Sequence, residues 1–383
     1  MKNKLSLLFL CCFTAPQIYA ASPMAGGDWM TSFSVQTDGT VKTWGELDLK
    51  SPATLQLTPI TVPSLTNVKQ VSNHFFLKND GTVWAIYRSG TSFLNSPPNQ
   101  IPISNVIKIA TSHSHTLALK SDGTVWGWSD NQQGELGTGS FTYSESTPVQ
   151  AIGLTGIIDI SASGSTSESS YALKNDGTVW AWGGNYYGQF GNGSTCGVMF
   201  CGISTPTQTP GLSGVIAVAG GYKHSVVLKN DGTVWVAGDT NGNSFKKVSG
   251  LANIVSIAAG LGTSMALKSD GAVWIFANSA SPAASVISGL SNIQSIQMGD
   301  GGGNYAVTPD GTMYAWGDAY PGNGTSRSSA PVIVGVVTAQ PPPVTGTPTA
   351  QVPALSEVGG MIMGALLLLI SLVAQTKRRS GIL

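Results

Sequence analysis

Histidine and cysteine are the side chains of this sequence most suited to chemistry. His113 and His115 form a His-Ser-His triplet, but alternate residues of a strand point to opposite faces and would not converge on one ion. His115 and His224 each lie seven residues before an Asp-Gly pair, where satisfying loop backbone groups is the simpler role. The sequence therefore predicts no metal site and no cofactor.

Cys196 and Cys201 lie five residues apart in "STCGVMFCGI", a segment without histidine or carboxylate. A metal site would need further ligands. In an exported chain, two cysteines at this distance more often form a structural disulfide than act as free thiols. We expect a Cys196–Cys201 disulfide.

Catalytic motifs are missing from the sequence. It contains no Gly-x-Ser-x-Gly elbow, and "GDGGGN" at 299–304 lacks the Lys-Ser/Thr of a phosphate-binding loop. The formal net charge is zero, which disfavours nucleic acid as a partner. We predict a protein that is not an enzyme, without catalytic residues.

The dominant pattern is a repeat centred on Asp-Gly. Seven such pairs recur at spacings of 39 to 55 residues, beginning at Asp38, Asp80, Asp122, Asp176, Asp231, Asp270 and Asp310. Each is flanked by alternating residues, as in "VVLKNDGTVWVAG" from Val226. Asp-Gly between alternating strands is typical of a hairpin with a type I′ turn.

About forty residues for each four-stranded unit is the period of a β-propeller. The sequence thus predicts an all-β, seven-bladed propeller of four-stranded antiparallel blades over 21–340. The fourth strands are the weakest in sequence, near Thr58, Thr147 and Ala330. The segment after Val334 is similar to the start of a further unit, so a blade shared between the chain ends is one way to close the ring.

The two ends predict export and anchoring. Residues 1–20 have the positive start, short apolar stretch and small final residue of a signal peptide. A Pro/Thr-rich linker at 341–351 precedes a 352–383 tail, in which 358–376 is an uncharged run long enough for a transmembrane helix. The basic residues after it, Lys377, Arg378 and Arg379, should remain cytoplasmic.

This tail resembles the IPTL-type C-terminal sorting signal of Gram-negative bacteria, Ile-Pro-Thr-Leu-Ser-Glu-Trp-Gly followed by an apolar helix and a basic cluster. The matching residues are Pro353, Leu355, Ser356, Glu357 and Gly359. The resemblance implies a membrane-embedded sorting protease as partner and a protein anchored in the inner membrane, facing the periplasm. If the protease cleaves the tail, the protein is released to the cell surface, and if it does not, the helix remains a permanent anchor.

The units resemble the regulator of chromosome condensation repeat over roughly 22–339. Its signatures are matched by "GYKHS" with His224, "DGTVWAWGG" from Asp176 and "NYYGQFGNG" from Asn185, with "NQQGELGTG" from Asn131 as a second copy of the last. The resemblance implies a propeller fold. The family's activities on chromatin and on a small GTPase do not suit an exported, neutral chain.

In such a propeller the Asp-Gly turns share one rim, and the long loops of blades three and four lie on the other. Long loops on a rigid scaffold are usual places for recognition. The predicted partner-binding residues there are Phe141, Tyr143, Tyr186, Tyr187, Met199, Phe200 and Tyr222. We expect a non-enzymatic module that binds a protein or glycan. The alternatives are an inhibitor of a secreted hydrolase (a β-lactamase or protease) and, less favoured, a lyase or glycosidase.

Overall fold

The chain divides into two units, Met1–Ala339 and Gln340–Leu383. The computed structural model describes only residues of the first: 24–25, 31–47, 55–87, 97–164, 167–198, 201–277, 283–299, 302–318, 321–325 and 327–336. The predicted signal peptide (1–20), linker (341–351) and sorting signal (352–383) lie outside them. In the described part, no helix has the length and apolar character needed to cross a membrane.

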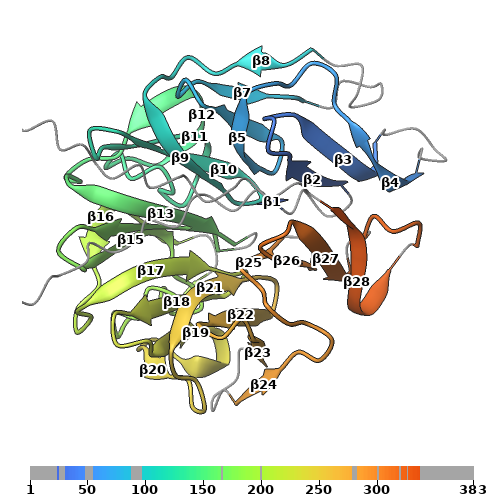
Figure 1. The fold of residues 1–383 in the computed structure, drawn as a ribbon. Coiled ribbons are helices and arrows are strands. Elements are labelled where there is room, and N and C mark those ends of the chain that lie inside the picture. The colour runs from blue at the N-terminus through green and yellow to red at the C-terminus, as the bar shows by residue number, and fades with distance from the viewer. Residues whose placement is uncertain are drawn as a thin grey trace, which may run out of the picture. The chain divides into compact units, whose positions relative to one another are not determined.

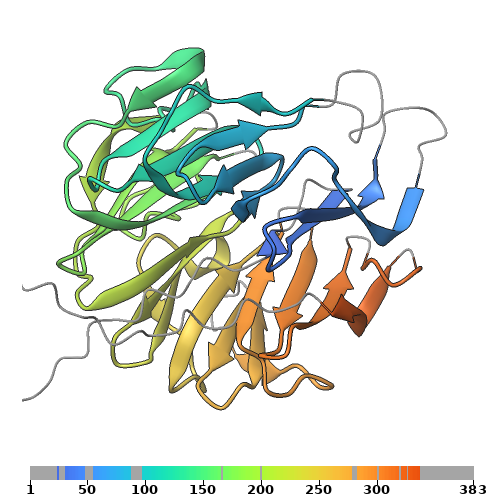
Figure 2. The ribbon, with the colours of Figure 1, turned by 45° about the horizontal axis from the view of Figure 1, so that its top comes forward.

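Seven four-stranded antiparallel sheets follow one another along the chain, as predicted (Figures 1 and 2). We number these blades one to seven. Their first strands are β1 (Met24–Ala25), β5 (Val68–Ser72), β9 (Val106–Thr111), β13 (Ile157–Ser163), β17 (Val215–Gly220), β21 (Ile254–Ala259) and β25 (Ser295–Met298). Their second strands are β2 (Thr31–Val35), β6 (Phe75–Lys78), β10 (His115–Lys120), β14 (Ser169–Lys174), β18 (His224–Lys229), β22 (Thr263–Lys268) and β26 (Gly303–Val307).

The third strands carry the Val-x-Trp pattern or its equivalent. They are β3 (Val41–Glu46), β7 (Val83–Ala85), β11 (Val125–Asn131), β15 (Val179–Gly184), β19 (Val234–Gly238), β23 (Val273–Ala277) and β27 (Thr312–Gly317). The fourth strands are β4 (Leu55–Thr61), β8 (Asn99–Gln100), β12 (Thr142–Gln150), β16 (Gly202–Gln208), β20 (Lys246–Lys247), β24 (Ala284–Val286) and β28 (Ser328–Val336). A 3₁₀ turn, η2 (Asp239–Asn241), follows β19.

The core lies between blades, because both faces of each sheet are covered by its neighbours. Phe33 of blade one packs edge-on against Phe76 of blade two, with ring centroids 5.5 Å apart. The same arrangement of buried aliphatic and aromatic residues recurs at the following blade boundaries. The fourth strands lie at the edge and are mostly exposed or half-buried, which explains why the sequence constrains them least.

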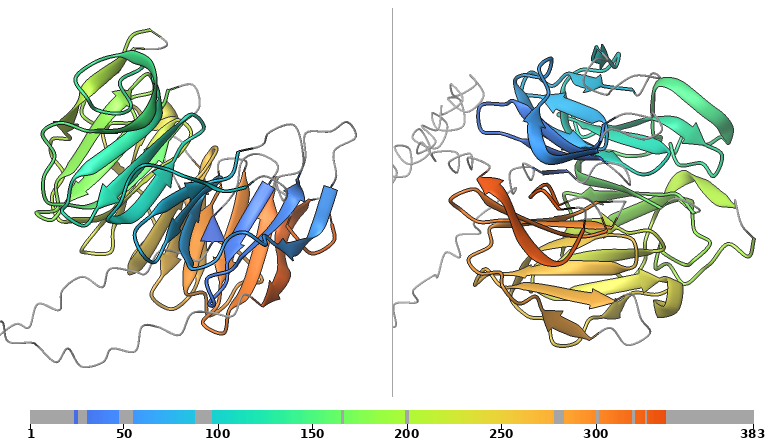
Figure 3. Two further views of the ribbon diagram at one scale, coloured as in Figure 1. Left: turned by 90° about the horizontal axis from the view of Figure 1, so that it is seen from above. Right: turned by 90° about the vertical axis from the view of Figure 1, so that its right-hand side faces the viewer.

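The first and last blades meet through side chains. Trp44 of blade one packs with Tyr305 and Met313 of blade seven, and the Ser32 and Tyr305 hydroxyls are 2.7 Å apart. Figure 3 shows the blue first blade beside the orange last one. Each sheet consists of one continuous stretch of chain, with β28 as the fourth strand of blade seven. The expectation of a blade shared between the chain ends is therefore wrong.

The Asp-Gly hairpins form as predicted, but their turn type differs. Only the glycine has positive φ, as at Gly81 (80°), and none of the seven aspartates does. The Gly81 amide donates to the Lys78 carbonyl at 3.1 Å, and the Lys78 amide donates to the Thr82 carbonyl at 2.9 Å. This is a type I turn followed by a left-handed glycine. The type I′ prediction is wrong, because that turn needs positive φ at both central residues and the aspartate does not have it.

The remaining residues of the Asp-Gly-Thr-Val-Trp motif form a short relay of hydrogen bonds. The Asp80 carboxylate accepts from the Thr82 amide at 3.0 Å and from its hydroxyl at 2.7 Å, and these bonds lower the pKa of Asp80 below its ordinary value. The Thr82 hydroxyl in turn accepts from the Trp84 indole at 3.0 Å. The same relay recurs at Trp126, Trp180 and Trp235.

The turns also connect successive blades. The Gly81 carbonyl accepts from the amide of Val106, the first residue of β9 in the next blade, at 3.0 Å. Five other boundaries have the same bond, from Val68, Ile157, Val215, Ile254 and Ile293 to the preceding turn glycine at 3.0 to 3.4 Å. A Cβ on Gly39 would lie 2.9 Å from the Asn67 Cα, so the contact requires glycine.

Blade six provides a test of the relay, because Ala272 replaces its threonine and the Trp274 indole nitrogen is buried without a partner. The substitution Ala272→Thr should restore two hydrogen bonds, from the threonine hydroxyl to Asp270 and from the Trp274 indole to that hydroxyl. We expect a gain of about 1 kcal/mol in unfolding free energy, or about 2 to 4 °C in melting temperature. Ala272→Val is the matched control, with similar bulk and no hydroxyl. A gain of equal size in the valine variant would contradict the explanation.

Candidate functional site

Two long loops share one local structure on the rim opposite the Asp-Gly turns. In blade three the Asn131 carboxamide oxygen accepts from the Leu136 amide at 3.0 Å, and in blade four Asn185 accepts from the Phe190 amide at 3.0 Å. Each loop extends over the following blade. The Glu135 carbonyl, for example, accepts from the Trp182 indole of blade four at 2.6 Å.

The blade-four loop (185–201) is the longer one, and it is fastened to blade five. The Gly193 amide donates to the Asn243 carbonyl at 2.7 Å, and the Asn243 carboxamide donates back to the Gly193 carbonyl at 2.7 Å. Cys196 and Cys201 form the expected disulfide, with their Cα atoms 5.9 Å apart. The loop therefore presents its side chains from a fixed backbone.

Three of the predicted aromatic residues come together here. The rings of Tyr186 and Tyr187 meet edge to face with centroids 4.9 Å apart. The Lys223 ammonium lies 4.9 Å from the Tyr187 ring and 5.7 Å from that of Tyr222, within the range of cation–π attraction. Tyr186 is exposed, and Tyr187 and Tyr222 are half-buried. We call these four residues the tyrosine surface.

The other predicted residues lie elsewhere. Phe141 and Tyr143 are exposed on blade three, directly before and within β12, with 57% and 81% of their surface accessible. Met199 and Phe200 lie outside the described residues. Lys223 thus links the tyrosines of blades four and five, and Phe141 and Tyr143 form a separate exposed pair at the outer strand.

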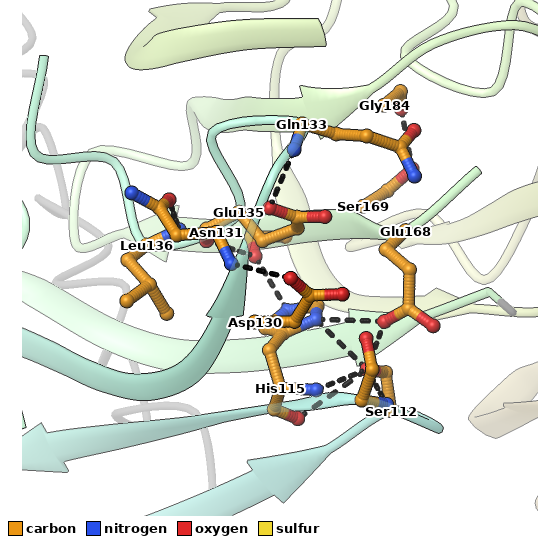
Figure 4. A network of polar contacts seen from close by, with 12 residues as sticks. Ser112, His115, Asp130, Asn131, Gln133, Glu135, Leu136, Glu168, Ser169 and Gly184 are labelled. Atoms are coloured by element: carbon orange, nitrogen blue, oxygen red, sulfur yellow. Dashed lines mark hydrogen bonds and ion pairs between the residues drawn. The ribbon is translucent and has the colours of Figure 1, made fainter. Parts of the chain in front are cut away.

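A buried polar network between blades three and four was not foreseen from the sequence (Figure 4). The His115 Nδ1 lies 2.9 Å from the Glu168 carboxylate and 2.8 Å from the Ser112 hydroxyl, which itself contacts Glu168. The His115 Nε2 lies 2.8 Å from the Ser170 hydroxyl, and that hydroxyl donates to the Glu135 carbonyl at 2.7 Å. His115 thus pairs with side chains, not with the loop backbone as predicted.

Within the described residues, this cluster holds the one histidine–carboxylate pair, and it is closed to solvent. The side chains of His115 and Glu168 are 0% and 3% exposed, and Glu135 is fully buried. A substrate has no access to them, so their role is to fasten blade three to blade four. His224 has a similar role toward blade six, with its Nε2 2.7 Å from the Ser264 hydroxyl, and burial lowers its pKa to about 4.

The histidine triplet does not converge on a site, since His113 is exposed and His115 is buried. Across the described residues, no three His, Cys, Asp or Glu side chains are grouped as a metal site would require. The loops of blades four and five offer aromatic rings and the Lys223 ammonium for contact. These are means of recognition.

The geometry of blades three to five agrees with comparisons to known proteins. The profile of the regulator of chromosome condensation (RCC1) repeat matches residues 122–167 and 176–228. A second profile of the same repeat matches 106–135, 157–189 and 215–244. The chain therefore contains RCC1 repeats within a seven-bladed β-propeller.

Two curated relatives match over about a third of the chain. The human E3 ubiquitin-protein ligase HERC2 is 35% identical over 137 residues, which are 35% of this chain and 3% of that protein. Protein pim1 of Schizosaccharomyces pombe is 31% identical over 141 residues, 36% of this chain and 26% of that protein. The chain thus spans only a small part of these relatives.

Solved structures extend the likeness of fold over most of the chain. Prp20p from Saccharomyces cerevisiae has a TM-score of 0.58 at 20% identity, covering 72% of this chain and 79% of that one. Human WBSCR16 has a TM-score of 0.54 at 19% identity, covering 82% and 81%. At these identities the likeness concerns the fold alone.

Glu135 gives the network a measurable pH dependence. Burial raises its pKa from 4.5 to about 7, so the fold favours the protonated form. Its contribution to stability is complete below about pH 4.5 and is lost as the pH rises through about 7. Gln189 occupies the equivalent position in the blade-four loop, and the substitution Glu135→Gln would provide the same neutral group.

We therefore expect Glu135→Gln to be more stable than the wild type at pH 8, by up to about 3 kcal/mol. The difference should shrink at pH 5, where Glu135 is protonated. Denaturant unfolding of both proteins at the two pH values measures it. The reciprocal variant Gln189→Glu should acquire the same loss of stability at high pH. A difference between Glu135→Gln and wild type that does not change with pH would refute the assignment.

Proposed function

We propose that this protein is an exported, non-catalytic binding module that recognises a partner protein through the tyrosine surface. The observation that carries the proposal is the group of exposed Tyr186 and half-buried Tyr187 and Tyr222 around Lys223, in part on a loop that is fastened to blade five. Tyrosine is enriched among the residues that dominate binding energy in interfaces. A loop already fastened by hydrogen bonds and a disulfide loses little conformational entropy on binding.

Similar folds support a role in protein binding. The structure of Prp20p was described together with its binding to Gsp1p and histones, and a second structure shows Kap60 bound to yeast RCC1 (Prp20). The ligase activity named for HERC2 concerns a protein of which this chain matches 3%. Binding is therefore the property of these relatives that we extend to this chain, and their particular partners are not carried over.

Export and anchoring belong to the same proposal. The signal-peptide pattern of 1–20 and the apolar run 358–376 followed by Lys377, Arg378 and Arg379 support an inner-membrane protein that faces the periplasm. The Cys196–Cys201 disulfide agrees with an oxidising compartment. Processing by a sorting protease would then decide between a permanent anchor and release to the surface.

Partner capture tests the tyrosine surface. The full chain and its Tyr186→Ser/Tyr187→Ser variant are used as bait on the host's envelope fraction. We expect the variant to lose at least tenfold in recovery of the captured protein, because two aromatic contacts are removed, with an unchanged melting temperature. Val286→Ser, on the exposed outer strand β24, is the control and should capture normally. Equal recovery by the tyrosine variant and the Val286→Ser control would remove the tyrosine surface from the proposal. Loss of capture after glycosidase treatment of the envelope fraction would identify a glycan as the partner instead.

The disulfide provides a test of export in cells. Thiol alkylation of the wild type should leave Cys196 and Cys201 unmodified, because they are oxidised after export. Deletion of residues 2–20 should retain the chain in a reducing compartment, where both thiols become modified. The variant Cys11→Ser/Cys12→Ser removes the other two cysteines and serves as the control for the full chain. Reduced thiols in the wild type would contradict export.

A further inference from the structure

A depression of about 500 Å³ lies between blades six and seven, on the same rim as the long loops. It is lined by the start of β22, the end of β25 and the residues at the end of β27 and the start of β28. The side chains used below are Thr263, Met298, Asn304, Asp318 and Arg327. None of these residues belongs to the tyrosine surface. Its volume lies within the range usual for small-molecule sites.

The depression lies where a pairing seen at other blade boundaries is absent. At two boundaries, a histidine that begins the second strand of one blade bonds a serine in the next blade, as His115 does Ser170 and His224 does Ser264. At the boundary of blades six and seven, Thr263 stands in place of the histidine and Asn304 in place of the serine. The shorter Thr263 side chain does not fill the volume of an imidazole, and the depression occupies this place.

Asn304 is left with an unused hydrogen-bond acceptor. The residue is 8% exposed, and its carboxamide oxygen has no partner. A buried acceptor without a donor costs free energy, which a bound donor would recover. Asn304 lines the depression, so the missing donor is one that a ligand can supply.

Two opposite charges flank this acceptor. Gly317 pairs with Ser328 across β27 and β28, which places Asp318 and Arg327 at neighbouring positions. Both are exposed, and among the described residues no ion pair joins them. The site therefore offers a carboxylate and an amide oxygen as acceptors and a guanidinium as a forked donor. Met298 contributes a half-buried apolar wall.

We propose that this depression binds a zwitterionic ligand, a free α-amino acid with an apolar side chain. Its ammonium group has three donors, which suit the Asn304 carboxamide oxygen and the Asp318 carboxylate. Its carboxylate suits the planar fork of Arg327, a geometry that favours bidentate bonding. Its side chain lies toward Met298. A neutral polyol would leave both charges unmatched.

Calorimetric titration of the full chain tests the proposal with L-leucine as probe. Two related probes each lack one charge: N-acetyl-L-leucine has no ammonium group and L-leucinamide has no carboxylate. We expect L-leucine to bind and both related probes to bind at least tenfold more weakly. No heat with L-leucine at millimolar concentration, equal binding of all three, or binding of glucose in place of leucine would overturn the proposal.

Three substitutions assign the contacts. Asn304→Ser introduces the residue found at the equivalent position of other blades, and Asp318→Asn and Arg327→Gln each remove one charge. Each should weaken L-leucine binding at least tenfold with an unchanged melting temperature. Arg327→Gln should weaken L-leucine but leave L-leucinamide unaffected, which a merely structural role would not produce. Lys246→Gln, on the exposed outer strand β20, is the control. L-leucine binding that survives all three substitutions would place the ligand elsewhere and overturn the proposal.

Discussion

A single backbone hydrogen bond, repeated from blade to blade, holds this propeller in register. In six of the seven Asp-Gly turns, the glycine occupies a left-handed conformation and its carbonyl accepts a hydrogen bond from an amide at the start of the next blade. A Cβ at that position would crowd the neighbouring backbone, most closely at Gly39 and Gly271, where it would lie 2.9 Å from an asparagine Cα. The turn that joins the second and third strands of one sheet thus also fixes where the next sheet begins. The packing of aliphatic residues between blades follows from that alignment.

The sequence was sufficient for the blades because their pattern is local. Asp-Gly between alternating residues specifies a hairpin, and seven copies at a regular period specify the propeller. The turn type was predicted wrongly because Asp-Gly is compatible with two kinds of hairpin connection. One is the two-residue type I′ turn, and the other is the observed three-residue connection that ends in a left-handed glycine. The expectation of a shared blade was wrong because the seam between the first and last blades depends on side chains far apart in the chain, as in the contact of Ser32 with Tyr305.

The polar network and the depression show the limits of the sequence more clearly. His115 was assigned a role toward its own loop, yet its partner Glu168 comes from the next blade, 53 residues away. No pattern within one repeat unit encodes such a pair. In contrast, Tyr186 and Tyr187 are neighbours in sequence on one loop, so part of the tyrosine surface could be predicted, and only its junction with Tyr222 and Lys223 required the fold. The depression does have a signal in the sequence: Asn304 stands at the position that Ser170 and Ser264 occupy in their blades. A comparison of equivalent positions between the repeats could have revealed it.

In the part of the chain that the structure describes, every sheet is formed by consecutive strands, and the first and last blades meet without exchanging a strand. A duplication or loss of one repeat in the gene would therefore add or remove a whole blade and leave the remaining sheets intact. Such a protein can therefore evolve by changes in the number of its blades as well as by changes in its loops.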